Sequence, residues 1–246
     1  MIIGIFSGLS FIEFAINLFP VAIIGLIIIW MIIVIVYKKE FRDKAILESD
    51  EFHPRIFKPL LIKSSIVLVI MLIAFISGLP IALSALGASA LLLITRRIKP
   101  ERVFVELDWS LLVFFSGLFI VTDLLNQILI TPNFKGSIEV ITKNPLIDLS
   151  VISLILSNLI SNVPAVLVLS PLIKQIENAE IFWLALAMSS TFAGNLTLLG
   201  SVANLIVAES AKRNGVVLSF TEYLKSGIPI TILTFLVGVV WLLLTL

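Results

Sequence analysis

The sequence predicts an all-α membrane protein, and three observations carry this prediction. Of the 246 residues, 59% are hydrophobic and only 13% are charged, about half the charged share of soluble domains. The apolar residues gather in runs of about 20, the length at which a helix spans a bilayer. The mean hydropathy is +1.17. A soluble fold of this length could not bury so much apolar surface, whereas lipid solvates it directly.

The rest of the composition argues against several other classes of protein. The net charge of +1 gives no reason to expect nucleic acid as a partner, and the lipid bilayer is the expected surrounding. With no cysteine and one histidine, neither a disulfide framework nor a thiolate or histidine metal site is expected. Paired carboxylates and nucleophile–base sets are absent from the sequence pattern, so we expect no catalytic residues and no enzyme. Met1 leads directly into apolar sequence, so no signal peptide is predicted.

The expected helices follow from the apolar runs and from the breakers between them. We expect spans at residues 14–37, 60–77, 81–95, 109–130 and 228–246. Gly78-Leu79-Pro80 would join the second and third spans in a tight hairpin. Residues 38–59 are predicted to form a cytoplasmic linker, and residues 96–107 a surface helix.

Lysine and arginine predict the orientation, because cytoplasmic loops of membrane proteins carry an excess of both. Fourteen of the 17 basic residues fall in three loops that we place in the cytoplasm: Lys38, Lys39, Arg42, Lys44, Arg55, Lys58, Lys63, Arg96, Arg97, Lys99, Arg102, Lys212, Arg213 and Lys225. Lys135, Lys143 and Lys174 fall in the other loops. This split requires residues 149–173 to enter and leave on the outer side. It predicts a multi-pass protein of the cytoplasmic membrane with both termini outside.

Residues 149–173 are long enough for one span, yet polar residues interrupt their middle: Ser157-Asn158 and then Ser161-Asn162-Val163-Pro164. Pro164 lacks a backbone donor and disfavours helical geometry at Val163. The two arms on either side would each be about 14–18 Å long, roughly half a bilayer. We therefore predict a re-entrant helical hairpin. The alternative is a single kinked span, which would invert every later loop.

Residues 181–211 are too long for one regular span and carry glycine, asparagine and hydroxyl residues at membrane depth. The notable ones are Gly194, Asn195, Thr197, Gly200, Ser201 and Asn204. Polar residues inside a membrane usually face protein or a water-filled cavity. We predict a broken helix that unwinds around Gly200-Ser201 and resumes at Asn204. The alternative is close helix packing by small residues.

Two stretches of the chain are similar at a constant offset of 209. Leu9-Ser10-Phe11-Ile12-Glu13-Phe14 with Pro20 matches Leu218-Ser219-Phe220-Thr221-Glu222-Tyr223 with Pro229. The charge pattern places the first copy outside and the second inside, which is the mark of an inverted-topology repeat. Residues 1–37 would then hold the last helix of a first repeat that is mostly absent, and residues 60–246 a whole second repeat. Chance similarity between two segments that precede helices is the alternative.

These motifs resemble the ion transporter superfamily of arsenite permeases, sodium/proton antiporters, and citrate and divalent-anion carriers. The matching pieces are Asp108-Trp109 leading into Phe114-Phe115-Ser116-Gly117, the tip Ser161-Asn162-Val163-Pro164, and the stretch from Gly194 to Ile206. The resemblance implies a secondary transporter for an inorganic ion or a small anion such as arsenite, driven by an ion gradient, or else a Na⁺/H⁺ antiporter. Dicarboxylate symporters carry threonine where Val163 stands, which argues against a dicarboxylate.

The resemblance also implies a chain nearly twice as long, with the binding site between two repeats. The chain would then be a truncated product, a fragment, or one subunit that needs a partner. A second chain supplying the missing repeat, or a homo-oligomer, would complete it.

An unwound membrane helix exposes carbonyl oxygens that suit Na⁺ and amide groups that suit an anion or polar solute. The candidate binding residues are Ser161, Asn162, Val163, Pro164, Gly194, Asn195, Thr197, Gly200, Ser201 and Asn204, with no cofactor other than Na⁺ or H⁺ as the coupling ion. Asp123 is the one carboxylate well inside a predicted span. It is either a coupling residue or an interfacial residue solvated near Asn126 and Gln127.

Overall fold

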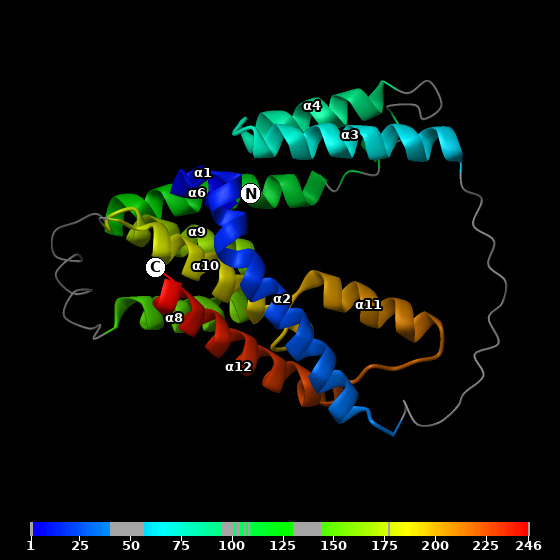
Figure 1. Cartoon of the computed structure of the whole chain (residues 1–246), viewed down its shortest axis with the longest axis vertical. Coiled ribbons are helices and arrows are strands. Elements are labelled where there is room, and N and C mark those ends of the chain that lie inside the picture. Colours follow the sequence, from blue (N-terminus) through cyan, green and yellow to red (C-terminus); the bar gives the residue numbers. More distant parts are fainter. Residues whose placement is uncertain are drawn as a thin grey trace.

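The computed structural model (Figure 1) describes residues 2–39, 57–94, 101, 104–105, 107, 109–129, 144–176 and 178–245. Its helices are α1 (Ile2–Ser7), α2 (Phe11–Val36), α3 (Lys58–Ile76), α4 (Ile81–Leu93), α6 (Trp109–Leu129), α8 (Pro145–Ile160), α9 (Asn162–Ile173), α10 (Glu180–Ala193), the short 3₁₀ turn η1 (Leu198–Gly200), α11 (Val202–Arg213) and α12 (Phe220–Thr245). Within these described ranges, three helices are long and apolar enough to cross a bilayer: α2, α3 and α12. The all-α membrane class is confirmed.

Helix α10 lies at the centre of the molecule and packs against α8, α9, α12, α2 and α1 (Figure 1). Its side chains from Trp183 to Ser190 are all buried. The closest neighbour is α8, whose buried face consists mainly of three fully buried serines, Ser150, Ser153 and Ser157. Small side chains at a helix interface let two backbones approach closely. The α8–α10 pair is therefore the compact centre against which α1, α2, α9 and α12 pack.

Helices α2 and α12 contain the two similar stretches of sequence, and their bounds correspond at both ends. Each is 26 residues long, and Phe11–Val36 plus the offset of 209 gives Phe220–Thr245. Each starts at a serine whose Oγ accepts a backbone N–H three residues on: Glu13 N at 3.2 Å and Glu222 N at 3.1 Å. At the start of α2 the Glu13 carboxylate also accepts a hydrogen bond from the Ser10 N–H, which completes a capping box.

The same two helices pack side by side and run in opposite directions (Figure 1). Tyr37 Oη, after the end of α2, donates to the carbonyl of Glu222 in the first turn of α12 at 3.4 Å. Trp241 Nε1, near the end of α12, donates to the carbonyl of Asn17 near the start of α2 at 3.0 Å. Midway between these contacts, Gly25 packs on Thr234, with 3.7 Å between an ideal Cβ of Gly25 and Thr234 Cγ2. Since Thr234 is the repeat equivalent of Gly25, the residue at the centre packs on its own counterpart.

Helices α8 and α9 are joined by one residue, Ser161, and pack against each other. Ser161 has φ 78° and ψ 158°, a backbone conformation that is almost confined to glycine. The chain therefore turns at Ser161, and the prediction that helical geometry fails at Val163 is wrong. Asn162, Val163 and Pro164 form the first turn of α9, where the missing N–H of proline removes no helical hydrogen bond.

The long helix predicted over residues 181–211 is interrupted, and the interruption differs from the prediction. Helix α10 already ends at Ala193, and α11 begins at Val202. Residues 194–201 between them contain only η1. The unwound segment thus starts before Gly200, and Asn204 lies inside α11 rather than at its start. In contrast to α10, α11 has no buried residue.

Other predicted bounds also shift. The last helix begins at Phe220 rather than at residue 228, because Ser219 caps it and Pro229 is accommodated within it, as Pro20 is within α2. Lys225 consequently lies in a helix, not in a loop. Helix α8 begins at Pro145, where proline suits a first turn, rather than at residue 149. The linker 38–59 and the surface helix 96–107 lie mostly outside the described residues.

The contact at Gly25 generates a stability prediction. An alanine Cβ would make ordinary contacts of 3.7 Å with Thr234 and Phe192, so Gly25→Ala should unfold close to the wild-type temperature. Gly25→Leu would overfill the centre of the α2–α12 pair and should lose about 1–3 kcal/mol. Thermal unfolding in detergent measures both variants. A leucine variant as stable as the alanine variant would contradict the described packing.

Candidate functional site

The carbonyl groups at the end of α10 are bound by asparagine side chains from other elements. The helix ends at Ala193, whose carbonyl accepts the N–H of Leu196 at 3.0 Å and has room for a second donor. Asn158, in the last turn of α8, donates through Nδ2 to the carbonyl of Ala193 at 2.6 Å. Its Oδ1 accepts from Thr197 Oγ1 at 2.9 Å. Both ends of the Asn158 amide thus tie the hairpin to the unwound segment.

Asn204, in α11 on the other side of the unwound segment, also donates to backbone carbonyls of that segment. Its Nδ2 donates to the carbonyl of Gly194 at 2.8 Å, and more weakly to that of Thr197 at 3.4 Å. Asn204 Nδ2 also lies 2.8 Å from Tyr223 Oη in the first turn of α12. We call Asn158, Asn204 and the residues 193–201 that they hold the break cluster.

Two glycines allow the backbone of the break cluster to pack this closely. A Cβ at Gly200 would lie 2.8 Å from Asn158 Nδ2 and 3.2 Å from the carbonyl of Ala193. A Cβ at Gly227, in α12, would lie 2.6 Å from the carbonyl of Asn195 and 2.9 Å from that of Leu196. The shortest distance at each position is below 3.0 Å, which is closer than a real Cβ comes to another atom. Helices α8 and α12 therefore reach the unwound backbone only because Gly200 and Gly227 lack a Cβ.

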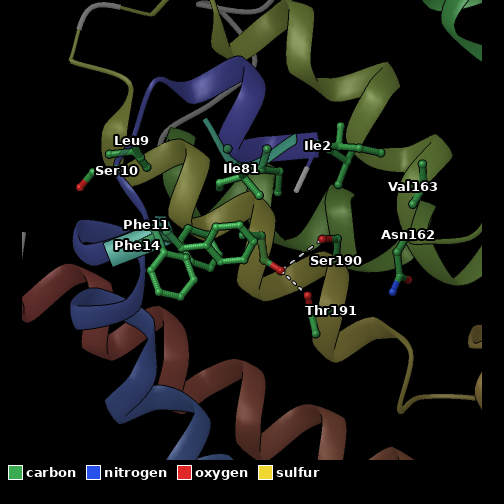
Figure 2. Close-up of a pocket in the computed structure, with 15 residues that line it drawn as sticks. Ile2, Leu9, Ser10, Phe11, Phe14, Ile81, Asn162, Val163, Ser190 and Thr191 are labelled. Atoms are coloured by element: carbon green, nitrogen blue, oxygen red, sulfur yellow. Dashed lines mark hydrogen bonds between the residues drawn. The ribbon is translucent and has the colours of Figure 1, made fainter. Parts of the chain in front are cut away.

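A cavity of about 430 Å³ lies on another side of the hairpin tip (Figure 2). Its walls come from α1, the start of α2, the facing ends of α3 and α4, the first turn of α9, and α10. Most of the lining is apolar, with the rings of Phe11, Phe14 and Phe75 on one side. The hydroxyls of Ser190 and Thr191 also line it, but both donate to the carbonyl of Ala187, at 3.2 and 2.7 Å.

Asn162 is a polar residue of this cavity whose side-chain oxygen has no described hydrogen-bond partner. It is the first residue of α9, and its Oδ1 is buried yet accepts no hydrogen bond from any described residue. A buried amide oxygen without a partner is unfavourable by about 1–3 kcal/mol. In addition, the first N–H groups of a helix have no partner within the helix. Asn162 therefore leaves an acceptor oxygen beside the first turn of α9 that no described donor fills.

The predicted site residues fall into these two groups. The break cluster brings together Gly194, Thr197, Gly200, Ser201 and Asn204, and Asn195 contributes the carbonyl that faces Gly227. At the hairpin tip, Asn162 and Val163 line the cavity, Pro164 is buried behind them, and Ser161 is exposed at the turn. No hydrogen bond between Asn162 and Asn204 occurs among the residues that the structure describes.

Asp123 has no described hydrogen bond to a residue of either group. It is exposed on α6, and its Oδ2 accepts from Gln127 Nε2 at 3.3 Å. The side chain of Asn126, and the residues Asp108, His53, Lys135 and Lys143, are outside the described part of the chain.

Asn158, in the break cluster, and Tyr223, whose hydroxyl contacts Asn204 of that cluster, were not among the predicted candidates. For Asn158 a signal was present, because it stands beside Ser157 in the polar middle of an otherwise apolar stretch. For Tyr223 there was none, since its hydroxyl reaches Asn204 only through the packing of α12.

Comparison with known proteins gives a family match over most of the chain. The family model described as CitMHS, citrate transporter, matches residues 1–193. The chain is 37% identical to a putative transporter arsB of Dictyostelium discoideum over 182 residues, which cover 71% of the chain and 32% of that relative. It is 37% identical to the silicon efflux transporter LSI3 of rice, over 71% of the chain and 39% of that relative.

Other relatives match along almost the whole chain. A 46 kDa membrane protein of Mycobacterium leprae is 30% identical over 98% of the chain and 61% of its own length. The chain thus spans about three-fifths of that relative and about a third of the arsB relative. No solved structure matches.

The close approach at Gly200 predicts that Gly200→Ala destabilises the protein. The new Cβ would displace the Asn158 amide and weaken its bond to Ala193, with an expected loss of about 1–3 kcal/mol. Gly87→Ala in α4 is the matched control, because a Cβ there meets nothing within 4 Å. Alanine favours a helix over glycine by up to about 1 kcal/mol, so the control should be as stable as the wild type or more so. Thermal unfolding in detergent compares them, and equal stability of both variants would contradict the described break cluster.

Proposed function

The chain belongs to the citrate transporter family, and from this membership we propose that it is the larger part of an inverted-repeat secondary transporter. It would move an inorganic ion or a small anion such as arsenite across the cytoplasmic membrane, coupled to an ion gradient. The observation that carries the proposal is Asn162, whose buried Oδ1 is unpartnered among the described residues at the tip of a helix pair and beside a cavity.

The character of the cavity supports a small solute of low charge. No lysine, arginine or histidine is among the described residues that line it, so a citrate-like trianion would enter without a compensating cation. Val163 adds an apolar side chain at the tip. The rice relative is named a silicon efflux transporter, which is in keeping with a small inorganic solute. Arsenite and similar hydroxylated species fit this chemistry better than dicarboxylates.

The break cluster offers oxygen ligands for a coupling Na⁺. The carbonyls of Ala193, Gly194 and Thr197 lie together, held by the amides of Asn158 and Asn204. Rotating either amide by half a turn would present Oδ1 in place of Nδ2, and a cation between the oxygens would replace the lost hydrogen bonds. Sets of carbonyl and amide oxygens suit hard cations. The alternative of a Na⁺/H⁺ antiporter that couples through Asp123 has less support, since the described contacts of Asp123 are with Gln127 alone.

The α2–α12 pair supports the inverted repeat. Two helices of matching bounds run antiparallel, and Gly25 packs on its own counterpart, Thr234. In general, a residue can contact its own equivalent only at the axis of a two-fold. An axis in the membrane plane would relate two repeats of opposite orientation. The helices α8 and α9 have 16 and 12 residues, about 24 and 18 Å in length, which is shorter than a hydrocarbon core of about 30 Å and suits a re-entrant hairpin.

A first repeat with its own hairpin and broken helix would supply the other half of the site. It would come from a longer form of this chain, from a second chain, or from a homo-oligomer. The second candidate function is therefore a subunit that transports only after assembly.

Asn162→Ala should abolish transport without unfolding the protein, because the lost Oδ1 makes no described hydrogen bond. Asn214→Ala is the matched control, since Asn214 is exposed and its Nδ2 binds only the carbonyl of Ser210 at 2.9 Å. Radiotracer flux of arsenite, citrate and sodium into proteoliposomes, with sodium or choline outside, measures both variants. Where the wild-type chain alone gives no flux, the assay is repeated after co-assembly with the first-repeat segment of the M. leprae relative. Wild-type flux in Asn162→Ala would eliminate the proposed site.

The orientation can be tested separately because the chain has no native cysteine. A cysteine at Lys174, after α9, should react with a membrane-impermeant thiol reagent added outside intact cells. A cysteine at Lys212, near the end of α11, should react only after the cells are opened. The reverse labelling pattern would reject the re-entrant hairpin and favour a single kinked span.

A further inference from the structure

A second cavity, of about 560 Å³, lies where α2 ends and α12 begins (Figure 1). Its lining consists of Ile35, Val36, Tyr37, Lys38, Lys39, Glu222 and Lys225. The hydrogen bond from Tyr37 Oη to the carbonyl of Glu222 holds the two helices together beside it. We call this set of residues the basic pocket. It is separate from both the hairpin-tip cavity and the break cluster, with which it shares no residue.

The basic pocket has an excess of positive charge. Glu222 forms an ion pair with Lys225, with 2.6 Å between Oε2 and Nζ, so these two charges compensate each other. Lys38 and Lys39 are exposed, and neither forms an ion pair with any residue that the structure describes. Among the described residues, Lys38 and Lys39 are thus the two ammonium groups of the basic pocket without an ion-pair partner, and the hydroxyl of Tyr37 lines the same pocket.

Its position is at the surface of the membrane. Helices α2 and α12 each have 26 residues, so each is about 39 Å long and exceeds a hydrocarbon core of about 30 Å. Their ends thus emerge among the lipid headgroups. The two residues just before Tyr37 are apolar and exposed, with Ile35 at 71% and Val36 at 39% of full exposure. The basic pocket combines an apolar wall on the membrane side with lysines at headgroup depth.

We propose that the basic pocket binds the phosphate headgroup of an anionic phospholipid, with Lys38 and Lys39 on the phosphate and the acyl chains against Ile35 and Val36. Basic pockets between transmembrane helices bind such headgroups in general. Soluble phosphate would use the lysines but not the apolar wall. The lipid would sit across the junction of the two repeat-related helices and stabilise their pairing.

Thermal unfolding of the whole chain in a neutral detergent tests the proposal. Phosphatidylglycerol should raise the unfolding temperature, whereas phosphatidylcholine with the same acyl chains, and glycerol 3-phosphate as the free phosphate, should not. The double variant Lys38→Gln/Lys39→Gln should weaken the apparent affinity for phosphatidylglycerol by about 30-fold. Lys225 is kept in this variant, because its removal would leave Glu222 without its partner.

Lys212→Gln/Arg213→Gln is the control, since it removes the same charge from another adjacent basic pair, at the end of α11. It also breaks the contact of Arg213 Nε with Glu209 Oε1 at 3.6 Å, an exposed ion pair outside the basic pocket that contributes little to stability. It should respond to phosphatidylglycerol as the wild type does. Lys38→Arg/Lys39→Arg keeps the charge and should also keep the response, which separates lipid binding from misfolding of the glutamine variant. An equal shift with glycerol 3-phosphate, or an unchanged affinity for phosphatidylglycerol in the Lys38/Lys39 glutamine variant, would overturn the proposal. So would an equal loss of affinity in the Lys212/Arg213 control.

Discussion

Between α10 and α11, eight residues, 194–201, leave the helix at the centre of a membrane protein. Their carbonyl and N–H groups need partners that hydrocarbon cannot provide. Asn158 from the hairpin and Asn204 from beyond the break provide donors for the carbonyls of Ala193 and Gly194. Much of the remaining arrangement depends on this requirement. Gly200 must lack a side chain so that Asn158 can reach the backbone, and Gly227 so that α12 can pack on it.

The pair α2–α12 is held by a different constraint, the antiparallel packing of two similar sequences. Gly25 and Thr234, which are separated by the offset of 209, meet at the middle of this contact, so their side chains determine how closely the helices approach. Here one copy has glycine, Gly25, and the other a buried threonine, Thr234. The combination lets Phe192 of α10 pack against the same point. The two repeat-related helices are thereby joined to the central helix, and the break cluster beyond it is positioned relative to them.

Sequence patterns were sufficient for the class, for most helices and for the location of both interruptions, because apolar run lengths and breaker residues act locally. They were insufficient where the deciding interaction is not local. The turn falls at Ser161 rather than Val163 because Pro164 is tolerated in the first turn of α9. Ser161, the residue before α9, then takes up the strained backbone conformation. Asn158 was passed over because its partners, Ala193 and Thr197, are more than 30 residues away in the chain. The start of α12 was missed because hydropathy does not register a serine cap.

Two asparagines near the hairpin tip differ in the hydrogen bonding of their side chains. Asn158, in the last turn of α8, makes a hydrogen bond through each end of its amide, whereas Asn162 starts α9 with a buried oxygen that no described residue satisfies. The first amide holds the hairpin against the unwound segment, and the second remains open to a ligand. A change in how the break cluster is bonded would act on Asn158, and through the single residue Ser161 and the following turn it would shift Asn162. In the proposed transporter, an ion at the break cluster and a solute at the cavity would therefore be linked through this short connection, which is the kind of coupling that a secondary transporter requires.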